Sequence, residues 1–267
     1  MCIRDRYALL CIVTFVVLFP VYTTVVAALK PGDEVLKNPL VPTTVTFDVL
    51  VEAWNEGRLG RYLFNSFVVA LIVTVAQLVT SLLAAYAFAF LDFPGKRAIF
   101  VLFVATLLVP LEATLVVNLD TVDGLGWLNT YQGLAVPFLA TAFGIFLLRQ
   151  VMLTLPRDLR DAARIDGVGH VGFLRHIAVP LMRPTLGALA LFGFLGTWNQ
   201  YLWPTLVVNE ADMNTVQSGL RLLRRSTLTE PNLVMAGTVI AAVPIFVALL
   251  VFQRQLVRGL TAGAVKG

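Results

Sequence analysis

The chain has 267 residues, of which 58% are hydrophobic and only 13% are charged, and its mean hydropathy is +0.83. Soluble globular domains carry about 25% charged residues, so this composition excludes a soluble globular protein. The formal net charge of +4 at pH 7 comes from residues in the connections between apolar stretches, and it gives little support to a nucleic-acid partner.

Six long apolar stretches divide the chain, and each exceeds the roughly 20 helical residues that cross a hydrocarbon core of about 30 Å. They span residues 7–29, 62–91, 98–119, 124–148, 184–209 and 231–253. Glu112 is the only Lys, Arg, Asp or Glu residue within them. Because lipid excludes charge, the pattern predicts an all-α integral membrane protein with six transmembrane helices. Little chain remains for a soluble module, so we expect residues 7–267 to form one membrane domain.

The two ends of the chain are expected on the cytoplasmic side. The first stretch is too long for the apolar region of a signal peptide, so it is interpreted as a retained anchor. With six spans both termini share a side, and that side carries more Lys and Arg than the other, as cytoplasmic loops do. Residues 1–6, MCIRDR, resemble a translated sequencing adaptor, and no function is assigned to them.

Prolines interrupt the apolar stretches. They are Pro20, Pro110, Pro137, Pro204 and Pro244. Each removes a backbone donor and favours a kink. In membranes such breaks persist where a cavity or neighbouring helices satisfy the freed carbonyls, which points to a pathway or to moving parts. Proline is also common in transmembrane helices, so both interpretations stay open.

The fourth connection, residues 149–183, is much longer than a turn between two spans requires. Pro156 suits the first turn of a helix, and Gly167 can end that helix in the left-handed conformation. Pro180 is expected to bend the chain back toward the membrane. Two groups of residues recur at helical spacing: Leu159, Ala162, Ala163 and Asp166, then Phe173, Leu174, Ile177 and Leu181. The connection is therefore predicted to form a helix-turn-helix at the membrane surface, suited to docking another protein.

The same connection carries a spaced motif. Its residues are Asp161-Ala162-Ala163, three residues, Gly167, nine residues, Ile177, one residue, then Val179-Pro180. This resembles the EAA loop of ABC importer permeases, EAA-x3-G-x9-I-x-L-P, with Asp161 in place of Glu and Val179 in place of Leu. We call residues 155–183 the EAA loop. Similarity to carbohydrate-type permeases of the maltose-transporter kind extends to Asn65-Ser66, Tyr86-Ala87-Phe88, residues 93–96, Trp198-Asn199 and residues 263–267.

The resemblance implies a permease subunit in the inner membrane of a bacterial or archaeal cell. Its implied partners are a second permease, two cytoplasmic ABC ATPases and an extracytoplasmic solute-binding protein, and its implied solute is a sugar or, alternatively, a glycerol phosphate. The sequence contains no G-x-x-x-x-G-K-[ST], so ATP and Mg are expected on the ATPase and this chain is expected to be neither an enzyme nor a cofactor carrier. The resemblance assigns ATPase coupling to Asp161, Ala162, Ala163, Gly167, Ile177 and Pro180. An alternative for Asp161 is pairing with Arg157 or Arg164 on its own helix.

Candidates for the translocation pathway are Glu112, Trp198, Asn199 and Gln200. A carboxylate within a membrane is a functional candidate by default, although Glu112 can instead reach the outer surface or bond backbone freed by Pro110. Flat rings beside amide groups suit sugar hydroxyls, and aromatic residues at this depth also serve as interfacial anchors. An ion-coupled secondary transporter would require more intramembrane ionisable groups than Glu112 alone.

Two further patterns are weighed in the loops. Residues 167–172 match G-x-G-x-x-G, but the match does not lie between a strand and a helix, so no dinucleotide site is predicted. His170 and His176 lack companion ligands, so no metal site is predicted either. A basic cluster consists of Arg221, Arg224 and Arg225. It has two open interpretations, contact with acids of the binding protein or attraction of an anionic solute.

Overall fold

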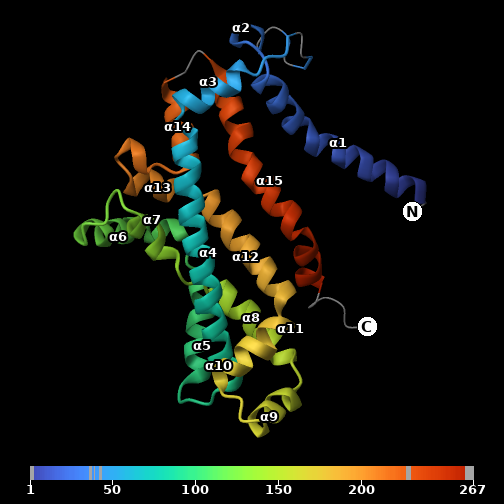
Figure 1. The fold of residues 1–267 in the computed structure, drawn as a ribbon, viewed down its shortest axis with the longest axis vertical. Helices are drawn as coiled ribbons and strands as arrows, with labels where there is room; N and C mark the ends of the chain where they lie inside the picture. Colours follow the sequence, from blue (N-terminus) through green and yellow to red (C-terminus); the bar gives the residue numbers. More distant parts are fainter. Residues whose placement is uncertain (1–2, 36–37, 39, 42–43, 227–229, 262–267) are drawn as a thin grey trace. The chain divides into compact units, whose positions relative to one another are not determined.

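We analysed a computed structural model of the chain, which describes residues 3–35, 38, 40–41, 44–226 and 230–261. All regular structure within these residues is helical (Figure 1). The α-helices are α1 Ile3–Ala28, α2 Gly32–Val35, α3 Asp48–Glu56, α4 Leu59–Phe90, α5 Lys96–Ala105, α6 Leu111–Gly124, α7 Tyr131–Ala135, α8 Ala142–Thr154, α9 Arg157–Ile165, α10 His170–Phe173, α11 Val179–Leu181, α12 Arg183–Trp198, α13 Leu202–Val207, α14 Val216–Ser226 and α15 Pro231–Thr261. Short 3₁₀ turns span Thr106–Leu108, Val136–Phe138 and Ala211–Met213, and a π turn spans Leu174–Ala178.

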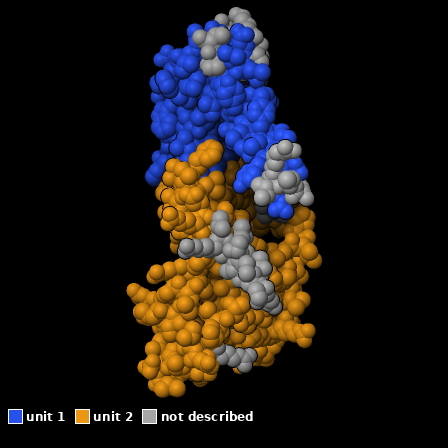
Figure 2. Space-filling model, turned by 90° about the vertical axis from the view of Figure 1, so that its right-hand side faces the viewer, with its two compact units in different colours: residues 1–65, 214–245 blue, residues 66–213, 246–267 orange. Residues whose placement is uncertain are grey.

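Two compact units make up the fold (Figure 2). Unit 1 comprises residues 1–65 and 214–245, and unit 2 comprises residues 66–213 and 246–267. The long helices α4 and α15 each contribute residues to both units. Unit 1 therefore holds most of the predicted outer connections, and unit 2 holds the EAA loop together with the central apolar stretches.

The core of unit 1 joins the end of α1, helix α3 and the start of α15. Its buried members are Ala28, Val49, Ala53, Leu233 and Ala236. Buried polar groups of unit 1 are paired within the unit: the Asn65 side chain donates to the Asn214 carbonyl at 2.9 Å, and buried Lys30 donates to the Asn38 carbonyl. A buried polar group without a partner would be costly, so these bonds fix the loops that return to the core.

The main core of unit 2 lies where the EAA loop meets the ends of α4, α8 and α12. Its buried members are Ala85, Tyr86, Leu148, Met152, Ala163, Phe173, Leu174, Ala178, Met182 and Leu189. Because one cluster contains residues of the loop and of three long apolar helices, the loop is built into the fold and does not hang from it.

Three helices are long and apolar enough to cross a membrane unbroken. They cover residues Asp5–Ala28, Leu59–Phe90 and Pro231–Leu256, and up to six spans result if each of three bent helix pairs counts as one. Most side chains of α1 from residue 5 to residue 22 are exposed, and a continuous apolar surface of this kind is unstable in water. The protein is thus an all-helical membrane protein, as the composition predicts.

The predicted stretches differ from the observed helices where the chain breaks. The third stretch is two helices, α5 with its 3₁₀ turn and then α6, at an angle of 102° across Pro110. The fourth begins at Tyr131 rather than at residue 124, bends by 45° after Phe138 and continues to Thr154. The fifth ends as a helix at Trp198 and resumes at Leu202. The breaks at Pro110 and after Pro137 agree with the kinks that prolines within the apolar stretches favour.

Some of the prolines stand at breaks between helices, and others lie inside helices that continue past them. Pro110 has extended backbone, with ψ 138°, and stands at the sharpest break, while Pro137 lies in the 3₁₀ turn before the 45° bend. Pro20 and Pro244 lie inside helices that continue past them. The carbonyls freed at the second break are satisfied from α4, since Gln77 donates to Phe138 O at 2.9 Å and Thr80 donates to Leu139 O at 3.0 Å.

Candidate functional site

Gly167 closes the first helix of the EAA loop. Its φ of +74° is the left-handed value that glycine adopts without a Cβ clash. Two hydrogen bonds complete the turn, from Val168 N to Ala163 O at 2.8 Å and from Gly167 N to Arg164 O at 3.1 Å. This six-to-one and five-to-two pair is the Schellman motif, and it directs the chain from α9 into α10. The predicted helix end at Gly167 is confirmed, and Pro156 is the residue that caps the start of α9.

One face of α9 is anchored in the core of unit 2. Ala163 is 4% exposed and belongs to the cluster described above, and Ile177 packs against that cluster from the following π turn. Pro180 lies in α11 and is half-buried. These positions leave Ala163 and Ile177 facing their own chain. The small side chain of Ala163 lets α9 lie close to the core.

The opposite face of α9 is open. Asp161 and Ala162 are exposed, and Ile165 follows one turn after Asp161 with 86% of its surface exposed. Among the side chains that the structure describes, Asp161 has no ion-pair partner, Arg164 included; the side chain of Arg157 lies outside them. An isoleucine so exposed on a helix beside a carboxylate is a candidate contact residue that the motif analysis missed. The signal for it was its place one turn from Asp161.

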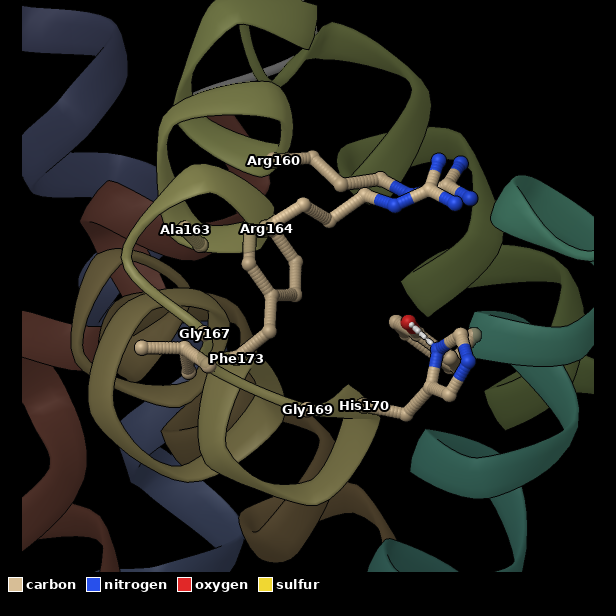
Figure 3. Close-up of a pocket in the computed structure, with 9 residues that line it drawn as sticks. Arg160, Ala163, Arg164, Gly167, Gly169, His170 and Phe173 are labelled. Atoms are coloured by element: carbon tan, nitrogen blue, oxygen red, sulfur yellow. Dashed lines mark hydrogen bonds between the residues drawn. The ribbon is translucent and has the colours of Figure 1, made fainter.

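A cavity of about 230 Å³ lies between α9, the start of α10 and the end of α4. Figure 3 shows Arg160 and Arg164 extending in the same direction from α9, with His170 on the other side of the cavity. The Tyr86 hydroxyl lies 2.6 Å from His170 Nδ1, and the Arg160 guanidinium lies 5.4 Å from the centre of the Phe90 ring. This link between α4 and the loop was not predicted from the sequence, because the residues are far apart along the chain.

The other loop patterns behave as polar surface. His176 is exposed and its Nδ1 lies 3.1 Å from the Gly172 carbonyl of the preceding turn. No cluster of three metal-ligating side chains occurs in the part of the chain that the structure describes. Residues 167–172 run from the end of one short helix into the next, a context without the strand that a dinucleotide fingerprint needs.

The intramembrane candidates separate into exposed and buried residues. Glu112 is exposed in the first turn of α6, where free backbone N–H groups favour a carboxylate. It lies one turn before Leu115, which belongs to the same buried cluster as Trp203. Trp198 is 1% exposed and stacks on Phe194 at 5.4 Å between ring centroids. Its ring is therefore part of the packing of this chain, and its place in a pathway stays a prediction.

The break between α12 and α13 presents the amide groups. Asn199 is exposed, and its side-chain nitrogen donates to Leu195 O at 2.9 Å. Gln200 is half-buried beside it. Trp203 is 1% exposed and donates from Nε1 to Gly133 O at 3.0 Å, which ties α13 to α7. Polar side chains at such a break are the kind of group that a membrane pathway needs.

The predicted basic cluster lies on α14 in unit 1. Arg221 is half-buried and Arg224 is exposed, while the side chain of Arg225 lies outside the described residues. The apolar side of α14 is buried, with Val216 and Leu223 among its members. The helix is therefore held in place with part of its basic face open.

Residues 9–262 match the family described as the binding-protein-dependent transport system inner membrane component. The chain belongs to this family. Its members are multi-pass inner-membrane permeases of prokaryotic ABC importers, they carry no cofactor, and their ATPase is a separate subunit. The permease is therefore part of a complex with an ATPase and a solute-binding protein, and the alternative of an ion-coupled secondary transporter falls away.

Curated relatives cover almost the whole permease. It is 36% identical over 264 residues to the sn-glycerol-3-phosphate transport system permease protein UgpE of Yersinia enterocolitica, with 95% of this chain and 94% of the relative covered. It is 38% identical over 265 residues to the UgpE protein of Rhizobium meliloti, with 95% and 94% covered. It is 35% identical over 255 residues to the arabinooligosaccharides transport system permease protein AraQ of Bacillus subtilis, with 94% and 91% covered.

A solved structure shares the fold of the permease. A chain of a bacterial ABC transporter involved in the import of the acidic polysaccharide alginate superposes with a TM-score of 0.82 at 20% identity, covering 95% of this chain and 98% of that one. At this identity the likeness concerns the fold alone.

Proposed function

We propose that the permease couples ATP hydrolysis on a partner to solute movement through the outward face of α9. Its contact residues in this proposal are Asp161, Ala162 and Ile165, which are all exposed. The observation that carries the proposal is the contrast across one helix, because the opposite face holds buried Ala163 in the core shared with α4, α8 and α12. A helix with one face exposed and the opposite face packed in the core can contact a partner and transmit its displacement to the core.

Gly167, Ile177 and Pro180 have a supporting role in this proposal. Gly167 sets the angle between α9 and α10, and Ile177 holds the second half of the loop on the core. Asp161 is suited to a charge-assisted hydrogen bond with a basic residue of the ATPase. Ile165 is suited to an apolar groove, where burying an isoleucine side chain contributes about 1.5–3 kcal/mol.

The assembly that we propose contains this permease, a second permease, two ABC ATPases and an extracytoplasmic binding protein. Residues 7–267 act as one permease domain, with the EAA loop and both termini in the cytoplasm. The solute is a sugar or a glycerol phosphate, the classes named for the relatives in Yersinia, Rhizobium and Bacillus. It moves inward by alternating access past the breaks near Glu112 and Asn199, with Gln200 beside them.

The test of docking compares two loop variants with two matched controls. Asp161→Lys and Ile165→Ser change exposed residues of α9. Asp120→Lys makes the same charge reversal, and Leu125→Ser the corresponding loss of an aliphatic side chain, at exposed positions around the end of α6. Each variant is purified with the second permease, and binding of the ATPase is measured in detergent without the binding protein. We expect each loop variant to weaken binding by about tenfold to a hundredfold, and each control to leave it unchanged.

Two results would contradict the proposal. If the native permease binds no ATPase while the pair is folded, the EAA loop is not a docking element. If the loop variants and the controls weaken binding equally, the outward face of α9 carries no specific contact. Uptake of a radiolabelled oligosaccharide and of glycerol phosphate by reconstituted vesicles then separates the two solute classes.

A further inference from the structure

The cavity beside α9 is lined by residues that have no role in the proposed docking of the outward face of α9. Arg160, Arg164 and His170 line it, and Tyr86 and Phe173 form its inner wall. We call these five residues the arginine pocket. Among the side chains that the structure describes, the lining contains no aspartate or glutamate. A half-enclosed space with two guanidinium groups and an imidazole is a site for an oxyanion.

The two arginines lie in an arrangement that is unfavourable without an anion. They are four residues apart on α9, where like charges weaken a helix. Within the described side chains, neither guanidinium has a carboxylate within ion-pair distance. The nearby acids Asp92 and Asp161 line a neighbouring groove that Arg160 also borders, and Asp92 pairs with Lys96 at 3.7 Å. An anion between Arg160 and Arg164 would relieve their repulsion.

Neighbouring aromatic residues hold Arg160 and His170 in place. Arg160 lies over the ring of Phe90, and such contacts position a guanidinium without neutralising it. The 2.6 Å contact with the Tyr86 hydroxyl fixes the ring of His170. When that hydroxyl donates to Nδ1, Nε2 carries the proton of a neutral imidazole and is itself a donor. Arg160 and His170 are thus preorganised, which lowers the entropic cost of binding.

We propose that the arginine pocket receives a carboxylate side chain of the docked ABC ATPase. This inference rests on the proposed function, and it adds a second contact of opposite sign to the one at Asp161. An acid of this permease facing a base of the ATPase, and bases of this permease facing an acid, would fix the register of α9 in its groove, because the reversed register would juxtapose like charges. The chemistry required of the ATPase is one Asp or Glu at the rim of the groove.

The experiment measures ATPase binding to the permease pair as a function of salt. Arg160→Gln and Arg164→Gln are made singly and together, and Arg175→Gln is the matched control, an exposed arginine of the EAA loop outside the pocket. We expect the double variant to lose about tenfold to a hundredfold in affinity at low salt, with a flatter salt dependence than the native protein. Arg164→Lys should recover only part of the loss, since lysine lacks the two-pronged geometry of arginine. Arg175→Gln should bind as the native protein does.

A second measurement identifies the source of the oxyanion. Thermal unfolding of the native pair and of the double variant is followed with and without inorganic phosphate. If phosphate stabilises only the native pair while the double variant binds the ATPase normally, the pocket serves a free anion and the proposed occupant is wrong. If neither measurement distinguishes the double variant from Arg175→Gln, the pocket is not an oxyanion site. A native pair that binds no ATPase would overturn the proposed function and this inference together.

Discussion

Replacing Gly167 by alanine tests whether the turn of the EAA loop is held by backbone conformation alone. An added Cβ at this position meets no atom of the described residues within 4 Å, so crowding by them contributes nothing. The cost is the left-handed φ of +74°, which for an L-residue is about 1–2 kcal/mol. Alanine also reduces the entropy of the unfolded chain, worth about 0.4–1 kcal/mol in the opposite direction. We therefore expect a net local loss of about 1 kcal/mol.

Two companion variants isolate that cost. Gly169→Ala changes a glycine two residues on, with φ −71° and likewise no atom within 4 Å of an added Cβ, and it should be neutral or slightly stabilising. Gly167→Asn places at the turn the residue that tolerates the left-handed region best after glycine, and it should lie between the native protein and Gly167→Ala.

Hydrogen exchange at the Val168 amide is the assay, because that group donates the 2.8 Å bond that closes the turn. A net loss of about 1 kcal/mol predicts exchange about fivefold faster in Gly167→Ala, with little change at amides in the middle of α4. ATPase activity stimulated by the permease should fall in the same order as the protection of Val168. Equal exchange rates in Gly167→Ala and Gly169→Ala would refute the reasoning.

Two further predictions concern packing within unit 2. Gly144→Ala brings a Cβ onto Ser81 Oγ and to 2.9 Å from Thr141 Cγ2, so we expect a loss of about 1–3 kcal/mol in the free energy of unfolding, measured by thermal unfolding. The control Gly196→Ala, where no atom of the described residues lies within 4 Å of an added Cβ, should lose no stability. Equal stability of the two variants would contradict close packing of α8 on α4. Trp203→Phe removes the donor to Gly133 O, and the unsatisfied carbonyl should cost about 1–3 kcal/mol, or roughly 2–4 °C in melting temperature for each kcal/mol.

The positions of the membrane helices were predictable because charge and hydropathy are properties of short segments. What hydropathy does not register is whether a break in a helix can be satisfied from elsewhere. The bend after Phe138 exists beside Gln77 and Thr80, which donate to the freed carbonyls from a helix some 60 residues earlier in the chain. Such a partner is known only from the tertiary structure. Local sequence therefore predicts an apolar stretch, and the tertiary structure determines whether that stretch forms one helix or two.

The same division applies within the EAA loop. Gly167 was predictable because a helix end with a left-handed residue is local chemistry. Ala162 and Ala163 are adjacent alanines, yet Ala162 is exposed and Ala163 is buried, with 4% of its surface exposed. Only the position of the core distinguishes them. Trp198 is likewise 1% exposed and stacks on Phe194, whereas the sequence offered a pathway position or an interfacial anchor for this ring. Ile165 shows the converse, since an apolar residue that ought to be inside is 86% exposed.

The anchoring of α9 bears on how motion would travel from an ATPase to the membrane. Ala163 shares its cluster with Ala85 and Tyr86 at the end of α4, and with Leu148 of α8 and Leu189 of α12. Interiors packed in this way transmit displacement instead of absorbing it. A shift of α9 imposed at Asp161 would thus act on three apolar helices at once. Two of these helices adjoin breaks in the chain: α8 begins after residues 139–141, and α12 ends before residues 199–201. At a break a helix can tilt without deforming its neighbour.

Alternating access then requires no hinge inside α4, which is one unbroken helix from Leu59 to Phe90. Introducing a flexible pair of glycines in the middle of α4 should therefore uncouple ATPase activity from transport while leaving ATPase binding intact.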